Sequence, residues 1–242
     1  MKYLYFFFFL AAMWSCQPQP APNTAFEMGW HGALHSIMHE GGLEGKIAIR
    51  DLLDKPHVYA LGAMEGLKGE LLIWDGGPVI AQVADSSLQL SQSSEGKAAL
   101  AVYATVPQWG PTIPIPYNVR DYEALENFIR SAAQKEKLDT DKPFPFLIEA
   151  TVNKLDYHII DWPEGDTIHS HEKHQQAGMR GSLSSTPVKI LGFYSSHHHG
   201  VFTHRNTNMH LHFMSMEAPI AGHIDSLIIE RGMGGLFLPK GD

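Results

Sequence analysis

The sequence predicts an α+β protein rich in antiparallel sheet, and three observations support this fold class. Strand-length apolar segments divided by glycine-rich turns occupy residues 46–106. One clear amphipathic helix follows at 120–135, and strand-length segments resume at 146–230. Strands that come in two groups, with short turns between neighbours, favour antiparallel pairing over a regular alternation of strands and helices.

The first sixteen residues have the composition of an export signal. One lysine precedes an apolar run of about a dozen residues, and small and polar residues then lead to Cys16, the chain's only cysteine. The run is too short to cross a bilayer as a helix, and the prolines of the linker at 17–23 cannot extend it. We therefore expect export to the cell envelope or periplasm and lipid attachment at Cys16, with an uncleaved anchor as the alternative.

Lipid attachment at Cys16 predicts a specific change in fractionation. A Cys16→Ser variant has no thiol to acylate, so it should become soluble in the periplasm or remain an uncleaved precursor. Membrane fractionation with mass analysis of the chain measures this. A variant of mature length that still sediments with membranes would show that the anchor is not a lipid.

Composition and charge describe a globular protein with a small ligand. The 242 residues can bury a substantial core without disulfides. Hydrophobic residues make up 44% and charged residues 18%, which is typical of a folded chain. The net charge of -8 argues against nucleic acid or an anionic membrane as a partner, so a small-molecule substrate is expected.

Residues 24–39 form the first predicted element, an amphipathic helix capped by Asn23 or Thr24. Its apolar residues recur every three or four positions, at Phe26, Trp30, Leu34 and Ile37 or Met38. Histidines recur every four residues on the same helix, at His31, His35 and His39. Because no obvious carboxylate or cysteine partner accompanies them, we interpret them as a solvated face and not as a metal site.

The remaining elements follow in two groups. Strands are predicted before the clear helix at 46–53, 58–84 and 97–106, and the DGG turn at 75–77 indicates a hairpin. The helix itself carries one apolar stripe, made of Tyr122, Leu125, Phe128 and Ile129. Beyond a seam near 141–146, further strands are predicted at 146–161, 188–196, 208–215 and 222–230.

Three histidines in the last group of strands are the strongest candidates for a metal site. Side chains alternate along a strand, so His210 and His212 in NMHLHFMS point to one face while the apolar residues between and after them pack behind. The turn at 216–222 then lets the next strand return with His223 on the same face. Three neutral imidazoles with an open coordination position are typical of a catalytic divalent site, zinc being the first candidate, with a metal-free polar cluster as the alternative.

The other histidines are weaker candidates. The run at 197–199 can bind adventitious metal or simply face solvent, and HSHEKH at 169–174 is interpreted as a surface loop. His204 lies closest in sequence to the strand of ligands, so we keep it as a candidate for substrate contact or for support of a ligand.

Three stretches carry the strongest resemblance to a known family. GLKGELLIWDG at 66–76 is similar to a Gly-Leu-x-Gly-Glu-Leu-x-x-x-Asp-Gly stretch, and MHLHF with GHIDS, at 209–213 and 222–226, is similar to a His-x-His strand followed by a Gly-His strand. GKIAIRDLL at 45–53 and ILGFYS at 190–195 are weaker matches. On these motifs the chain resembles the alpha-acetolactate decarboxylase family over roughly residues 45–230.

The resemblance implies a fold, a metal and a reaction. The fold would have two β-rich lobes, about 24–143 and 144–242, of mixed or antiparallel sheet with a few helices, a metal site between them, and assembly as a homodimer. The family's zinc ion would bind His210, His212 and His223. The implied reaction converts (S)-2-acetolactate to acetoin and carbon dioxide, which makes the protein a carboxy-lyase.

The implied reaction suits such a site. Loss of carbon dioxide from a 2-hydroxy-3-oxo acid leaves an electron pair that delocalises into the neighbouring carbonyl, and a cation near those oxygens stabilises the charge without an organic cofactor. The carbon must then be protonated. Glu70 matches the family's glutamate, so the resemblance makes it the candidate proton donor or substrate-holding group, with Glu65 as a weaker alternative.

Two departures from the family pattern concern carboxyl groups. The family carries an arginine in a Thr-Arg-x-x-Pro segment, and aligning the prolines puts Ile160 in the arginine's place. An alkyl group cannot pair with a substrate carboxylate, so His204 or Arg205 is expected to do so, with Arg180 as the next candidate. The family's second carboxylate comes from a longer C-terminal tail, and only Glu230 lies nearby here.

We therefore expect a metal-dependent decarboxylase of 2-hydroxy-3-oxo acids. Two other functions stay open: a non-catalytic metal- or ligand-binding protein on the same scaffold, and a metalloenzyme with a different substrate. Metal analysis alongside a carbon dioxide assay separates the three.

Overall fold

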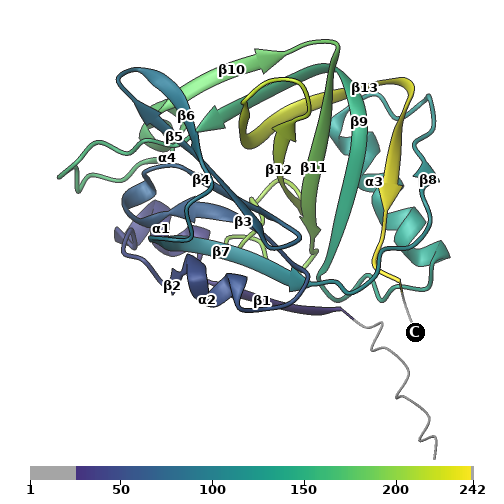
Figure 1. Cartoon of the computed structure of the whole chain (residues 1–242), viewed down its shortest axis with the longest axis horizontal. Coiled ribbons are helices and arrows are strands. Elements are labelled where there is room, and N and C mark those ends of the chain that lie inside the picture. The colour runs from purple at the N-terminus through teal and green to yellow at the C-terminus, as the bar shows by residue number, and fades with distance from the viewer. Residues whose placement is uncertain (1–25, 241–242) are drawn as a thin grey trace, which may run out of the picture.

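The computed structural model describes residues 26–240 (Figure 1). The expected export signal at 1–16, with Cys16, and the linker at 17–23 lie outside the described residues. Within the described range, no helix combines the length and the apolar character needed to cross a membrane.

The first sheet contains the strands of the N-terminal half, and all its ladders are antiparallel. Their order is β1-β7-β3-β4-β5-β6, with β2 paired to β7. The bounds are β1 (Glu27–His31), β2 (Ile47–Ala48), β3 (Val58–Met64), β4 (Glu70–Trp74), β5 (Gly77–Ala84), β6 (Ser87–Ser91) and β7 (Lys97–Thr105). The predicted hairpin is confirmed, because Trp74 pairs with Gly77 and the two residues between them, Asp75 and Gly76, have φ of 48° and 77°.

The second sheet contains β8 (Ile113–Pro114), β9 (Phe144–Ile159), β10 (Met179–Leu183), β11 (Thr186–Tyr194), β12 (Met209–Ser215) and β13 (Ala221–Phe237). The long strand β9 pairs with β11 along one edge and with β13 along the other. Since β11, β12 and β13 are also paired in turn, these four antiparallel strands close into a ring, with β10 added to the end of β9 (Figure 1).

The helices are few and short, which agrees with the predicted class. They are α1 (Leu34–Glu40), α2 (Ile49–Leu53), the 3-10 turn η1 (Glu65–Leu67), α3 (Tyr122–Lys135) and α4 (His171–Gln176). The helix predicted at 120–135 is confirmed as α3, which begins after Asp121, whose side chain accepts a hydrogen bond from the Ala124 N–H at 2.7 Å. The apolar face of α3 packs in the same core cluster as β9 and β12.

A shared core joins the two sheets. Leu61 and Leu72 from the first sheet lie in one buried cluster with Leu191 and Phe193 from the second. The structure therefore has two antiparallel sheets in contact, as the predicted fold class requires (Figure 1). None of the ladders is parallel within the described strands, so the mixed-sheet alternative is excluded for this part of the chain.

The helix predicted at 24–39 is largely wrong. Residues 27–31 instead form β1, which adds to β7, and only Leu34–Glu40 is helical. Gly32 separates the two elements: its φ is +76°, and a Cβ there would lie 2.0 Å from the Ala99 carbonyl oxygen. The apolar spacing fits either element, and pairing with a strand about seventy residues away decided between them.

Two shorter predictions also need correction. The strand expected at 46–53 is strand only at Ile47–Ala48, and the helix α2 follows because Ile49 and Leu52, three residues apart, both reach the core. The loop expected at 169–174 contains the start of α4, whose cap Ser170 accepts a hydrogen bond from the Lys173 N–H at 3.2 Å. His174 is buried there, because its ring stacks on Trp162 at a centroid distance of 4.2 Å.

Candidate metal and substrate site

His210, His212 and His223 meet on one face of the second sheet, as the sequence predicts. His210 and His212 lie two residues apart on β12, and His212 is directly paired with His223 on β13. The His223 Nδ1 atom lies 3.2 Å from Nε2 of His210 and 3.3 Å from Nε2 of His212. All three side chains are buried, and the alternate residues of β12 pack in the hydrophobic core behind them.

The donor set fits a divalent metal ion. Tetrahedral zinc with bonds of about 2.0–2.1 Å places its ligand nitrogens about 3.3 Å apart, close to the spacing of these imidazoles. Burial lowers the pKa of His212 to about 3, and burial likewise holds the pKa values of His210 and His223 well below their usual range. Neutral imidazoles are the form that binds metal, so the three residues are ready to act as ligands.

Glu70 reaches this group from the opposite sheet. It is the first residue of β4 and only 5% exposed, with Oε2 at 3.5 Å from Nε2 of His212. Its Oε1 accepts a hydrogen bond of 3.0 Å from the Ile160 N–H. Burial raises the pKa of Glu70 to about 7, against the opposing effects of His158 and the Ile160 hydrogen bond. A cation bound to the three histidines would lower this pKa again.

The glycine before Glu70 explains part of the GLKGEL pattern. Gly69 has φ +130°, and a Cβ there would lie 2.5 Å from the carbonyl oxygen of Ala81 on the neighbouring strand β5. A glycine is therefore needed for β4 to begin where it does. This close approach places the Glu70 carboxyl at the junction of the two sheets.

His158 is one of the site residues that sequence reasoning missed, and Asp225 is another. His158 lies on β9, where it pairs directly with His223, and the two rings are 4.6 Å apart. Its Nδ1 is 2.8 Å from Asp225 Oδ1 and its Nε2 is 3.8 Å from Glu70 Oε1. Burial opposes charge on the ring, but the hydrogen bond to Asp225 and the charge of Glu70 outweigh it and raise the pKa of His158.

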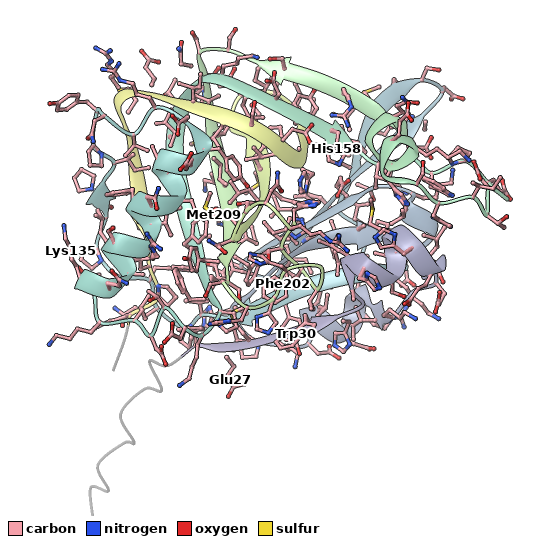
Figure 2. All side chains as sticks on the ribbon, turned by 180° about the vertical axis from the view of Figure 1, so that it is seen from behind. Glu27, Trp30, Lys135, His158, Phe202 and Met209 are labelled. Carbon is pink, nitrogen blue, oxygen red and sulfur yellow. The ribbon has the colours of Figure 1, made fainter. Side chains whose placement is uncertain are left out.

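Glu70, His158, His210 and His223 line one cavity of about 880 Å³, within the size range of small-molecule sites, and His212 lies buried beside them. The walls of this cavity come from both sheets, from α1 and from the loop before β12. The main contributors are Gly62, Ala63, Glu70, Leu100, His158, Ile160, Arg180, His204, His210, His223 and Asp225. Figure 2 views the molecule from behind, with His158 above Met209, the first residue of β12, and Phe202 below on the loop that leads to that strand.

Of the other residues that the sequence suggested for the site, some line this cavity and others lie outside it. The His204 ring lies 5.5 Å from that of His223 and lines the cavity. Arg205 and Glu230 are exposed and are not among the lining residues. Glu65 lies outside the cavity too, where its Oε1 accepts a hydrogen bond from the Gly45 N–H at 2.9 Å. Ile160 contributes its N–H to Glu70 and its alkyl side chain to the cavity wall.

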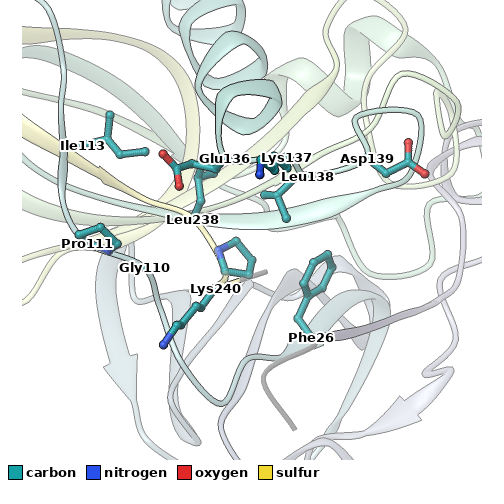
Figure 3. Close-up of a pocket in the computed structure, with 11 residues that line it drawn as sticks. Phe26, Gly110, Pro111, Ile113, Glu136, Lys137, Leu138, Asp139, Leu238 and Lys240 are labelled. Atoms are coloured by element: carbon teal, nitrogen blue, oxygen red, sulfur yellow. The ribbon is translucent and has the colours of Figure 1, made fainter. Parts of the chain in front are cut away.

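A second cavity, of about 570 Å³, lies between the end of α3 and the last described residues of the chain (Figure 3). Phe26, Leu138 and Leu238 form its apolar part, and Lys137 and Lys240 lie at its edge. No histidine and none of the predicted site residues lines it.

Glu126 on α3 fixes the loop that carries His204. Its Oε2 accepts hydrogen bonds from the Thr207 hydroxyl at 2.6 Å and the Asn208 N–H at 2.9 Å, and its Oε1 accepts one from the Asn208 amide at 2.6 Å. These bonds hold the chain immediately before β12. The helix that the sequence identified most clearly thus positions the strand that carries two of the candidate metal ligands, His210 and His212.

We expect Glu126→Ala to destabilise the fold by about 2–4 kcal/mol, because three partners lose a carboxylate acceptor in a partly buried place. Urea unfolding of the metal-free protein measures this. The control is Glu123→Ala on the exposed side of the same helix, with an expected change of about 0.5 kcal/mol. Equal effects of the two substitutions would show that the Glu126 contacts do not stabilise the loop.

Comparison with known proteins identifies the family of this chain. The family pattern of alpha-acetolactate decarboxylase matches residues 30–234. Among curated proteins, none matches this chain. Two solved structures share the fold at TM-scores of 0.67 and 0.68: the alpha-acetolactate decarboxylase of Bacillus subtilis strain 168, 15% identical over 87% of this chain and 83% of that one, and the acetolactate decarboxylase of Bacillus subtilis subspecies spizizenii, 15% identical over 89% and 86%.

A third structure is a Staphylococcus aureus protein of unknown function described as similar to alpha-acetolactate decarboxylase. It is 17% identical over 87% of this chain and 84% of that one, with a TM-score of 0.67. At these identities the structures show a shared fold, while the family pattern extends over most of the sequence. The chain therefore belongs to the alpha-acetolactate decarboxylase family.

Proposed function

We propose that this protein is a metal-dependent decarboxylase of 2-hydroxy-3-oxo acids, with (S)-2-acetolactate as the first candidate substrate and acetoin and carbon dioxide as products. One observation carries the proposal: three buried, neutral imidazoles meet beside a buried carboxyl from the opposite sheet, and two of them, together with that carboxyl, line one cavity. Family membership supports the same type of reaction.

The histidines define where the reaction takes place. A divalent ion held by them, with zinc as the first candidate, would supply Lewis-acid stabilisation of the negative charge that develops on substrate oxygens. His210, His212 and His223 offer one nitrogen each from rigid strands, so their positions are fixed before substrate arrives. Apolar residues such as Leu100 and Ile160 line the same cavity and limit the access of water to the reacting carbon.

Glu70 provides the proton. When the bond to the carboxylate carbon breaks, its electron pair stays on the carbon that bears the hydroxyl group, and that carbon must gain one proton to give the product. The Ile160 N–H holds Glu70 Oε1, so Oε2 is the oxygen directed at the histidines and the position from which a proton is delivered. Water replaces the proton on Glu70 after product leaves.

The test uses purified protein of known metal content. Carbon dioxide and neutral product are measured over a panel of 2-hydroxy-3-oxo acids, before and after removal and return of zinc. We expect release of both products that depends on the metal. A protein that binds metal tightly but releases no carbon dioxide from any member of the panel would instead be a binding protein or a metalloenzyme with other chemistry.

A further inference from the structure

The substrate of the proposed reaction is an anion, and the structure offers one permanent cation to receive it. Among the described residues that line the histidine cavity, Arg180 is the only arginine or lysine. Asp225 and Glu70 line the same cavity, so a carboxylate that enters would otherwise meet other carboxyl groups beside the metal position. The guanidinium group of arginine stays protonated over the whole pH range in which proteins are folded.

The register of the second sheet places Arg180 on the same face as the metal ligands. Arg180 on β10 pairs with His158 on β9, His158 pairs with His223 on β13, and His223 pairs with His212 on β12. Residues that are directly paired in antiparallel strands project to the same side of a sheet. The four residues therefore form one row across four strands, with the arginine at one end and the metal ligands at the other.

Contacts then fix where the guanidinium lies. Its Nη1 is 2.9 Å from Asp225 Oδ2, and Asp225 Oδ1 is 2.8 Å from His158 Nδ1. Asp225 is the extra residue at a register shift of β13, between the pairs that Ile224 and Ser226 make with β9. A bulge of this kind changes the direction of a side chain, and here the carboxylate of Asp225 points toward both Arg180 and His158.

We propose that Arg180 binds the carboxylate of the substrate, and that Asp225 and His158 position its guanidinium. This inference rests on the proposed function for the identity of the anion. A guanidinium presents five N–H donors in a planar fork, so a contact with Asp225 through Nη1 orients the plane while the fork receives a second carboxylate. Ile160 has no polar group in its side chain and Arg205 does not line the cavity, so neither provides this contact.

The experiment compares two unreactive ligands that differ in charge. 2-Hydroxy-2,3-dimethylbutanoate has the hydroxyl and the carboxylate but lacks the keto group, so it cannot decarboxylate by this route. 3-Hydroxy-3-methylbutan-2-one has the hydroxyl and keto groups, with a methyl group in place of the carboxylate. Both are titrated by calorimetry into the zinc-loaded protein, and zinc content is measured for each variant.

In Arg180→Gln we expect the Kd of the acid to rise about ten- to two-hundred-fold, while the Kd of the neutral ketone and the zinc content stay unchanged. Arg180→Lys keeps the charge but not the fork, so it should recover part of the affinity. The control is Arg231→Gln, an exposed arginine of β13 outside the cavity, which should leave both ligands unaffected.

Three results overturn the inference: no binding of the acid by the unmodified protein, an equal loss for both ligands, or no loss for either in Arg180→Gln. Failure of the proposed function looks different. If no 2-hydroxy-3-oxo acid releases carbon dioxide while the acid still binds through Arg180, the cavity is an anion site beside a metal and the reaction is another one.

Discussion

Replacement of His212 by alanine should lower the bound divalent metal from about one equivalent per chain to a small fraction. The substitution leaves two protein ligands, His210 and His223, and opens the chelate that rigid strands hold in place. The affinity of a three-histidine site should then fall by orders of magnitude. Elemental analysis after dialysis against a competing chelator measures the loss.

The matched control is His39→Ala, which removes an exposed histidine of α1 that does not line the cavity. It should retain full metal occupancy. Full occupancy in His212→Ala as well would contradict the assignment, since it would place the metal on residues other than these three. Equal loss of bound metal in both variants would show that surface histidines, and not one defined site, bind the metal.

The meeting of the three candidate metal ligands could be predicted because each step was local. Alternation along 209–215 puts His210 and His212 on one face, and the following turn is short enough to bring His223 back beside them. The fold class was predictable for the same reason, since hairpin turns such as Asp75-Gly76 encode antiparallel neighbours directly.

The rest of the site depends on long-range register. His158 reaches His223 only because β9 and β13 pair across 65 positions, and a slip of one residue would turn its ring to the other face. Asp225 sits at a register shift, which strand periodicity does not predict. Arg180 joins the row through a further strand, β10, after the short helix α4 that the sequence did not indicate.

The same dependence on long-range pairing explains why the helix predicted at 24–39 was largely wrong. The apolar spacing of 26–38 is compatible with a helix, but the edge of β7 offers backbone hydrogen bonds to residues 27–31. Gly32 then allows a turn that a residue with a side chain could not make against Ala99. Tertiary pairing outweighed local propensity there, whereas in α3 the cap and the apolar stripe agree with the core.

The substitution Glu70→Gln should keep the metal and abolish most of the turnover. Glutamine fits the same space and its amide oxygen can still accept the Ile160 N–H, so the junction between the sheets is retained. It cannot deliver a proton, and loss of one proton-transfer group typically costs about a hundred- to ten-thousand-fold in rate. Initial rates of carbon dioxide release at saturating substrate, with metal content determined on the same samples, measure the effect.

The control for Glu70→Gln is Glu65→Gln, which changes the same functional group five residues earlier but outside the cavity, at the contact with the Gly45 N–H. It should leave turnover within a factor of about two. If Glu70→Gln also keeps its turnover with full metal occupancy, the carboxyl serves only to accept the Ile160 hydrogen bond. The proton must then come from water or from another group of the cavity, such as Tyr122, because the carbon that loses its carboxylate cannot remain unprotonated in the product.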